Sequence, residues 1–273
     1  MRLKPEAAII GSALIGFLLF FVSADFAHAD SRADDIANAV QNRSEGSAST
    51  RFIDMTLTDR RGKVRKRRAV VYRRKNEGLS YTRISYISPK RIRDTAFLSH
   101  DNSTNASDQR WLYLPVTKRV RRIPGSDRGD NFLGTDFTYE DINGQLKFDH
   151  DDYRFTYVES TKINGRQTHV LNAIPVSKEV ARELGYGGLT AKIDELSWLP
   201  IEIEFVDPDQ RPLKKVTVPS FNKIDGIWTP LKIEAINHQT QHQTVFEYSQ
   251  VNYMGSLNST IFEPNELHRG VGE

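Results

Sequence analysis

The chain has 273 residues and contains no cysteine. The absence of cysteine excludes a disulfide scaffold, a zinc–thiolate site, an iron–sulfur cluster, a cysteine nucleophile and a lipid-modified N-terminal cysteine. Hydrophobic residues make up 38% of the chain and charged residues 27%, a balance that permits a packed core and argues against wholesale disorder. The net charge of only +3 does not by itself suggest a nucleic-acid-binding protein.

The first 29 residues predict a secretory signal peptide. Arg2 and Lys4 give a positive start, Ala7 to Val22 is almost entirely apolar, and Ala27-His28-Ala29 fits a small-x-small cleavage site. Cleavage after Ala29 would leave residues 30–273 as one exported domain, in the periplasm if the source is a Gram-negative bacterium. An uncleaved membrane anchor is the alternative, although its 16 apolar residues fall short of the roughly 20 that span a bilayer.

A short helix near residues 31–42 follows, since Ser31 and Asp34 resemble a capping box and Ile36 and Val40 share a helix face. After a polar linker, residues 43–50, the chain shows alternating apolar and polar residues, a pattern typical of strands with one solvent-exposed face. The alternating apolar sets include Tyr153, Phe155 and Tyr157; Leu189, Ala191 and Ile193; Ile201, Ile203 and Phe205; and Leu231, Ile233 and Ala235.

Turn signals separate these strands at short intervals, and Asn164-Gly165 is the strongest hairpin signal. A second short helix is predicted from the cap Ser177 to Leu184, ended by Gly185. We predict roughly eleven strands and two short helices, with no βαβ alternation and no repeat. This favours a mainly β fold with one large curved antiparallel sheet, an open half-barrel, although periodicity alone leaves a two-sheet sandwich open.

The middle of the chain carries a long motif. Trp111 to Pro115 reads Trp-Leu-Tyr-Leu-Pro, Arg121 to Ile123 reads Arg-Arg-Ile, and Phe132 to Asp141 reads Phe-Leu-Gly-Thr-Asp-Phe-Thr-Tyr-Glu-Asp. These segments resemble the outer-membrane lipoprotein-sorting family related to LolA, with Thr135 in place of the usual serine and Leu133 where methionine is common. A looser resemblance covers most of residues 50–269.

The resemblance implies a half-barrel wrapped around a helix-lidded hydrophobic cavity that carries lipoprotein acyl chains or lipids. The aromatic residues expected to line the cavity are Trp111, Tyr113, Phe132, Phe137, Tyr139, Tyr153, Phe155 and Tyr157. Each has plain core packing as its alternative. Residues 124–143 are predicted to form a long ordered loop whose aromatic side chains pack at the barrel mouth.

Charge is distributed unevenly along the chain. Residues 51–75 contain eleven Lys or Arg against two acids, and residues 127–152 contain eight acids. The basic stretch predicts either a patch for anionic headgroups or a partner, or a solvated hairpin whose charges prevent aggregation. The expected partner or headgroup residues are Arg65, Arg67, Arg68, Arg121 and Arg122. Asp136, Glu140 and Asp141 are expected to cap backbone amides or to pair with Arg121 and Arg122.

The sequence shows no nucleophile constellation or phosphate loop, so we expect neither catalysis nor a cofactor. His238 and His242 lack a third ligand, and no metal is expected. Two functions remain. The first is a periplasmic carrier that moves lipidated proteins or lipids toward the outer membrane, with transient membrane-surface contact and no nucleic acid. The second is a non-transporting accessory subunit of an inner-membrane lipid exporter of the resistance-nodulation-division type.

Overall fold

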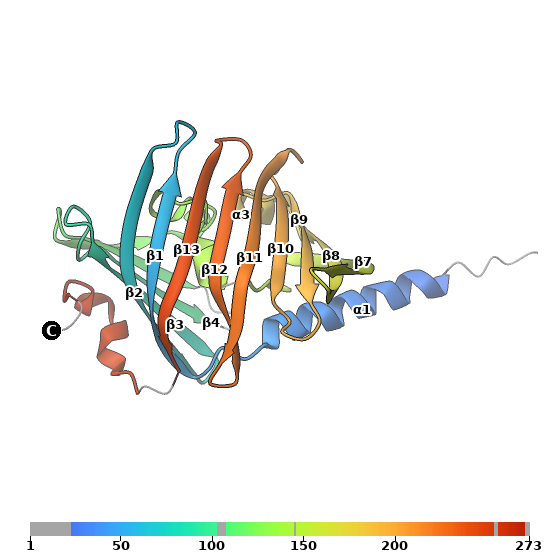
Figure 1. The fold of residues 1–273 in the computed structure, drawn as a ribbon, viewed down its shortest axis with the longest axis horizontal. Helices are drawn as coiled ribbons and strands as arrows, with labels where there is room; N and C mark the ends of the chain where they lie inside the picture. The colour runs from blue at the N-terminus through green and yellow to red at the C-terminus, as the bar shows by residue number, and fades with distance from the viewer. Residues whose placement is uncertain (1–22, 103–107, 145, 254–255, 271–273) are drawn as a thin grey trace, which may run out of the picture.

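The computed structural model describes residues 23–102, 108–144, 146–253 and 256–270. Within these residues thirteen strands form one unclosed antiparallel sheet, which confirms the predicted curved half-barrel and not the sandwich (Figure 1). The strands are β1 (Ala48–Thr58), β2 (Val64–Asn76), β3 (Leu79–Ser88), β4 (Ala96–Asn102), β5 (Gln109–Leu114), β6 (Arg119–Ile123), β7 (Tyr153–Ile163), β8 (Arg166–Pro175), β9 (Gly188–Asp194), β10 (Pro200–Val206), β11 (Pro212–Ile224), β12 (Ile227–Asn237) and β13 (His242–Asn252).

The helices of the described residues are short apart from the first. They are α1 (Ser23–Asn42), α2 (Tyr139–Gly144) and α3 (Lys178–Leu184), with 3-10 turns η1 (Gly125–Asp127), η2 (Phe132–Gly134), η3 (Ser259–Phe262) and η4 (Pro264–Glu266). In the described part of the chain, no helix combines the length and apolar character needed to cross a membrane.

Two local predictions are confirmed in detail. The Ser177 hydroxyl accepts a hydrogen bond from the Val180 amide at 3.2 Å, and Gly185 ends α3 in the left-handed region at φ 75°. Asn164 and Gly165 both have positive φ and form the β7–β8 hairpin turn. These signals are local: a cap or a type I′ turn depends on a few adjacent residues.

Other sequence predictions need correction or remain untested. The sheet has thirteen strands, not roughly eleven, because strands such as β6 (Arg-Val-Arg-Arg-Ile) show no apolar alternation. The predicted helix at 31–42 is the second half of α1, so the predicted cleavage site after Ala29 falls within that helix. The first 22 residues of the predicted signal peptide lie outside the described residues.

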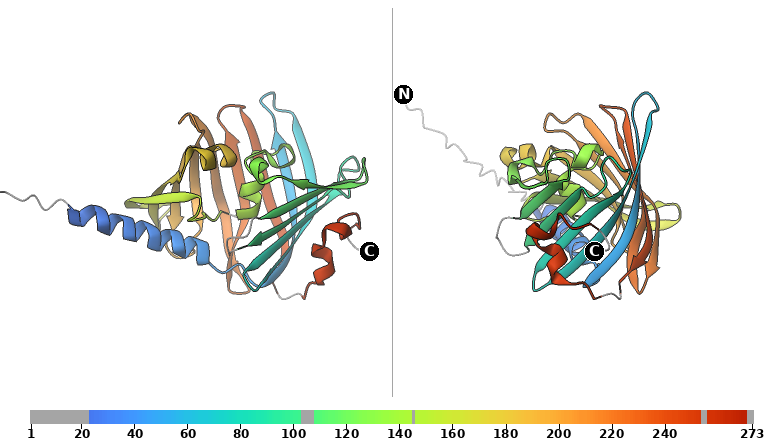
Figure 2. Two further views of the ribbon diagram at one scale, coloured as in Figure 1. Left: turned by 180° about the vertical axis from the view of Figure 1, so that it is seen from behind. Right: turned by 90° about the vertical axis from the view of Figure 1, so that its left-hand side faces the viewer.

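The order of strands in the sheet fixes the geometry of the cavity. The order is β6-β5-β4-β3-β2-β1-β13-β12-β11-β10-β9-β8-β7, so the two edge strands are consecutive in sequence. The chain leaves one edge after Ile123 and returns at the opposite edge at Tyr153. The crossing segment, residues 124–152, therefore has to span the open side of the half-barrel, and Figure 2 shows it inside the curve of the sheet.

The concave face of the sheet forms the main core. In β1, burial alternates strictly, and the inward residues are Ser49, Arg51, Ile53, Met55 and Leu57. The apolar members pack with residues from strands on both sides and with Phe132, Phe137 and Phe148 of the crossing segment. A curled sheet of this width cannot fill its own interior, and the aromatic side chains of the crossing segment supply the missing volume.

The convex face carries a second, smaller core under the C-terminal residues. Leu98 and Tyr113 of the sheet pack against Phe262 and Leu267, with Trp111 at the margin. The buried guanidinium of Arg83 donates to the carbonyl oxygens of Ile261 at 3.0 Å and Arg269 at 2.6 Å. The segment carrying η3 and η4 is therefore held against the outside of β3 to β5, opposite the main core (Figure 2).

Gly129 and Gly125 provide a test of how tightly the crossing segment packs. A methyl group at Gly129 would lie 2.5 Å from the Glu183 carbonyl oxygen, whereas one at Gly125 would meet no atom within 4 Å. We expect Gly129→Ala to lower the free energy of unfolding by about 1–3 kcal/mol through overpacking against α3, and Gly125→Ala to leave it nearly unchanged. Urea unfolding measures both, and equal effects would contradict this packing.

Candidate functional site

The crossing segment is anchored to the sheet by a buried lysine. The Lys214 side chain of β11 is 2% exposed. Its ammonium group donates to Asp141 Oδ2 at 2.5 Å, to the Tyr186 hydroxyl at 2.6 Å and to the Asp136 carbonyl oxygen at 3.0 Å. Tyr186 in turn donates to the Asp141 carboxylate at 2.9 Å. All three N–H groups of the ammonium donate hydrogen bonds, and these bonds offset the cost of burying its charge.

A second anchor lies at β13. The Asp136 carboxylate accepts from the Thr244 hydroxyl at 2.6 Å and lies 2.6 Å from His242 Nδ1, while the Asp136 amide donates to Thr244 Oγ1 at 3.0 Å. Because Asp136 precedes α2 and Asp141 lies in its first turn, the two anchors fix the start of this helix against the concave face.

The acids of the crossing segment do not pair with the arginines that the sequence suggested. The prediction that Arg121 and Arg122 serve as their partners is wrong, since Glu140 pairs with Arg110 at 2.8 Å and Asp141 pairs with Lys214. Arg121 and Arg122 lie on the edge strand β6 and are exposed. Asp141 does cap a backbone amide, because its carboxylate accepts from the Thr138 amide at 2.7 Å.

Beneath α2 lies a cavity with about 890 Å³ of empty space, including its open mouth. Most of the lining is apolar and comes from β1, β2, β3, β12, β13 and the crossing segment. The apolar lining residues are Ile53, Met55, Val71, Ile84, Phe137, Ile142, Leu146, Trp228, Pro230, Ile233 and Phe246, with Tyr248 and Tyr253 beside them.

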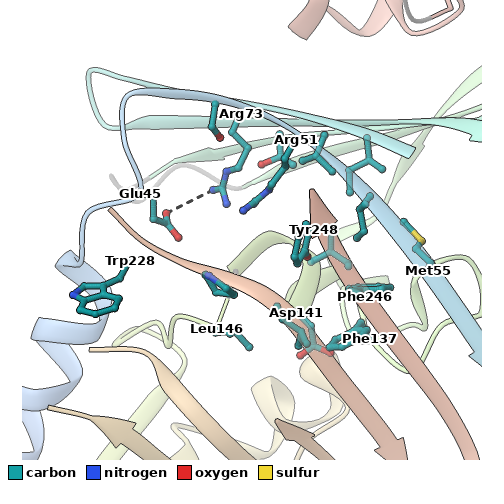
Figure 3. A pocket seen from close by; sticks show the side chains of 18 of the residues that line it. Glu45, Arg51, Met55, Arg73, Phe137, Asp141, Leu146, Trp228, Phe246 and Tyr248 are labelled. Carbon is teal, nitrogen blue, oxygen red and sulfur yellow. Dashed lines mark ion pairs between the residues drawn. The ribbon is translucent and has the colours of Figure 1, made fainter. Parts of the chain in front are cut away.

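The opposite end of the same cavity is charged. Arg43, Glu45, Arg51 and Arg73 line it (Figure 3). Glu45 lies 3.5 Å from Arg43, 3.8 Å from Arg73 and 3.0 Å from Lys147. Burial opposes ionisation of Glu45, yet the three cations outweigh it and lower its pKa to about 2.

A second, smaller cavity of about 540 Å³ adjoins the first. The two share Phe137, Asp141 and Leu146 of the crossing segment as lining residues. The crossing segment supplies most of the lining of the second cavity, and β7 and β9 to β11 supply the opposite wall, including Tyr153 and Phe205. The crossing segment thus separates two adjacent spaces on the concave face.

The structure brings some of the predicted aromatic residues to these cavities and not others. Phe137 lines both cavities and Tyr153 lines the smaller one. Phe132 and Tyr139 pack against Phe97 in the main core, with ring centroids 5.3 and 5.6 Å from it. Phe155 also belongs to that core.

The remaining predicted aromatic residues lie away from the larger cavity. Tyr157 stacks under the Arg32 guanidinium, 4.0 Å from its ring centre, and hydrogen-bonds Ser160 at 2.8 Å. Trp111 and Tyr113 belong to the convex cluster beneath the C-terminal segment. The inward residues of that strand are Leu112 and Leu114.

The predicted basic residues are dispersed. Arg65 is exposed and lies 3.3 Å from His242 Nε2. Arg67 donates to the Leu133 carbonyl oxygen at 2.7 Å, and Arg68 pairs with Asp54 at 3.7 Å. Arg67 therefore ties β2 to the crossing segment.

Sequence reasoning missed the charged end of the cavity. Arg51 shares a strand face with Ile53 and Met55, and Arg73 shares one with Ala69 and Val71. A charged residue on an otherwise apolar strand face was the available signal. The density of basic residues around both positions hides this signal, because Arg51 and Arg73 stand in a run of other Lys and Arg residues.

Solved structures share this fold. A Vibrio parahaemolyticus domain classed with outer membrane lipoprotein-sorting proteins is 28% identical, with a TM-score of 0.80, covering 88% of this chain and 100% of that one. A DUF1329 family protein from Desulfovibrio piger is 24% identical, with a TM-score of 0.80, over 88% and 99% of the two chains. A LolA superfamily protein from Nitrosomonas europaea is 18% identical, with a TM-score of 0.63, over 85% and 97%.

The half-barrel, its crossing segment and these similarities show a LolA-like fold, as the central motif predicted. A family model described as "Uncharacterized protein" matches residues 78–269, and the chain belongs to that family. The comparison with curated proteins found no match.

The buried anchor can be tested by removing its charge. Lys214→Met would leave the Asp141 carboxylate without its cation, and we expect a loss of about 3–5 kcal/mol in the free energy of unfolding. The control is Lys215→Met, because Lys215 is more exposed and pairs with Glu202 and Glu204 at the surface; a change below about 1 kcal/mol is expected there. Urea unfolding of both variants gives the comparison, and similar losses would argue against the anchor.

Proposed function

We propose that this protein is a carrier that binds acyl chains of lipoproteins or lipids in the cavity and moves them toward the outer membrane. The observation that supports this most is the apolar cavity of about 890 Å³ between the concave sheet and the crossing segment. The lipoprotein-sorting relative from Vibrio parahaemolyticus supports the class of cargo. The role involves binding and release and no covalent step.

The physical benefit of such a carrier is large. An acyl chain gains about 0.8 kcal/mol for each CH₂ group removed from water, so a 16-carbon chain exposed to water would cost about 12 kcal/mol. Apolar side chains from β1, β12 and β13 can replace that water along the length of the cavity. Shielding of this kind makes transfer through an aqueous compartment feasible.

The same proposal places the protein in the periplasm. The charged start, apolar run and Ala27-His28-Ala29 site support export by a cleavable signal peptide. Export would put the carrier between the membrane that supplies the lipid and the membrane that receives it.

Bound lipid is the direct test. We expect the purified mature protein, residues 30–273, to yield acyl species on solvent extraction and mass spectrometry, and to take up a fluorescent fatty acid. Ile142→Asn places an amide in the apolar lining and should weaken uptake roughly tenfold, because burying an unpaired amide costs about 1–3 kcal/mol. Ile174→Asn, at a position 60% exposed on β8, is the control and should bind normally. Absence of both bound lipid and uptake would refute the carrier.

A second candidate is an accessory role beside an inner-membrane lipid exporter of the resistance-nodulation-division type. The β1–β2 hairpin favours it, because its tip projects past the neighbouring β12–β13 hairpin (Figure 1) and carries exposed basic residues. Those at or beside the tip are Arg60, Arg61, Lys63, Arg65 and Lys66. An anionic membrane surface attracts such residues by about 1 kcal/mol each.

Charge reversal at the tip tests this surface contact. The triple change Arg60→Glu, Arg61→Glu and Lys63→Glu should abolish cosedimentation with vesicles containing phosphatidylglycerol at low salt. The same number of reversals at Arg154, Lys162 and Arg182, which are exposed elsewhere, controls for net charge. If both triple variants lose binding equally, the tip has no special part in docking.

A further inference from the structure

The charged end of the larger cavity holds more positive than negative charge. Arg43, Arg73 and Lys147 converge on Glu45. Arg51 adds a fourth cation, with its guanidinium carbon 4.8 Å from the centre of the Tyr248 ring. Three cations of the described residues therefore surround Glu45, and Arg51 lies near Arg73. The next acid that interacts with Arg73 is Asp101, whose own pKa burial raises to about 6.

The cations of this end do not all have the same role. Arg43 donates to the carbonyl oxygens of Val40 at 3.3 Å and Leu146 at 3.2 Å, so it ties α1 to the crossing segment. Lys147 also belongs to that segment. Arg51 and Arg73 come from β1 and β2 instead, and Figure 3 shows both guanidinium groups pointing into the cavity.

Arg73 is incompletely satisfied. Its Nη1 atom is buried and makes no hydrogen bond to the described residues. The ion pair with the Glu45 carboxylate runs through Nη2, at 3.8 Å. Burial lowers the pKa of Arg73, which shows that its charge is held at a cost in free energy. An unpaired guanidinium nitrogen inside a cavity is a donor available to an anion.

The cavity is polar at one end and apolar along the rest. Along the inward face of β1 the order is Ser49, Arg51, Ile53 and Met55, which are successive positions on one side of the strand. Figure 3 shows Met55, Phe137 and Phe246 at the side away from Arg73 and Glu45. An apolar chain lying along this face would therefore bring its head group to the two arginines.

We propose that the cavity binds an amphiphile with one anionic group, a carboxylate or a phosphate, which Arg51 and Arg73 recognise while its acyl chain lies along Ile53, Met55 and Phe246. This inference rests on the proposed carrier function and narrows its cargo. The acyl chains of a lipoprotein are joined to the protein through thioether and amide linkages, which carry no negative charge. The cargo that fits this cavity is therefore a free anionic lipid.

The experiment compares probes that differ only at the head group. A pyrene-labelled fatty acid, its methyl ester and the monoalkyl phosphate with the same labelled chain are titrated into the mature protein. We expect the fatty acid to bind roughly tenfold more tightly than its ester, the difference expected for a charge-assisted hydrogen bond. The tighter of the two acids identifies whether a carboxylate or a phosphate fits better.

Arg73→Met should remove this preference and leave ester binding unchanged. The control is Arg74→Met, since Arg74 is the next residue of β2 and faces the convex side. Glu45→Gln should change the affinity for the acid in the opposite direction. Removing the competing carboxylate should tighten binding of the acid severalfold. This variant keeps the test decisive if Arg73→Met fails to fold.

The outcomes separate the two proposals. Equal affinity of the unaltered protein for acid and ester, or no effect of Glu45→Gln, overturns the anion site and leaves the carrier intact. A failure to bind any of the three probes removes the carrier function itself. Preference for the acid that survives Arg73→Met would also overturn the assignment of the head-group site.

Discussion

The buried ion pair between Lys214 and Asp141 is the contact on which the arrangement of the molecule depends. The sheet is open, and its two edge strands are joined by a single segment that has to cross the concave face. Leu133, Ile142 and Leu146 of that segment pack against the core beside its aromatic side chains. Lys214 makes three hydrogen bonds to the segment and to Tyr186, and this fixes the depth at which α2 lies. The height of the cavity beneath α2 follows from that depth.

The cavity owes its character to one strand more than to any other. Because side chains alternate along a strand, β1 directs Arg51, Ile53 and Met55 to the same side within five residues. The change from basic to apolar lining thus occurs over about 13 Å of backbone. Under the proposed carrier function, a substitution at Arg51 or Arg73 would alter the selectivity for cargo without changing the apolar lining.

Local features of the fold could be predicted from the sequence, and features created by distant contacts could not. Ser177, Gly185 and the Asn164-Gly165 turn act on neighbouring residues, so the α3 boundaries and the β7–β8 hairpin followed directly. Trp111 and Tyr113 were expected at the cavity because they are aromatic, but strand periodicity does not say which face is concave. The partners that anchor Asp136 and Asp141 to the rest of the fold, Tyr186, Lys214 and Thr244, lie 45 residues or more away in the sequence, beyond the reach of any local pattern.

The pairing of β1 with β13 has a consequence for how the chain folds. Strands β1 to β6 and β7 to β13 can each form by pairing sequential neighbours, but the two halves meet only where the first strand contacts the last. Contacts between such distant parts of the sequence form slowly, and here they need nearly the whole chain. The export proposed for this protein would require the chain to stay unfolded until it has crossed the membrane. Late joining of the two halves at the centre of the sheet would meet that requirement.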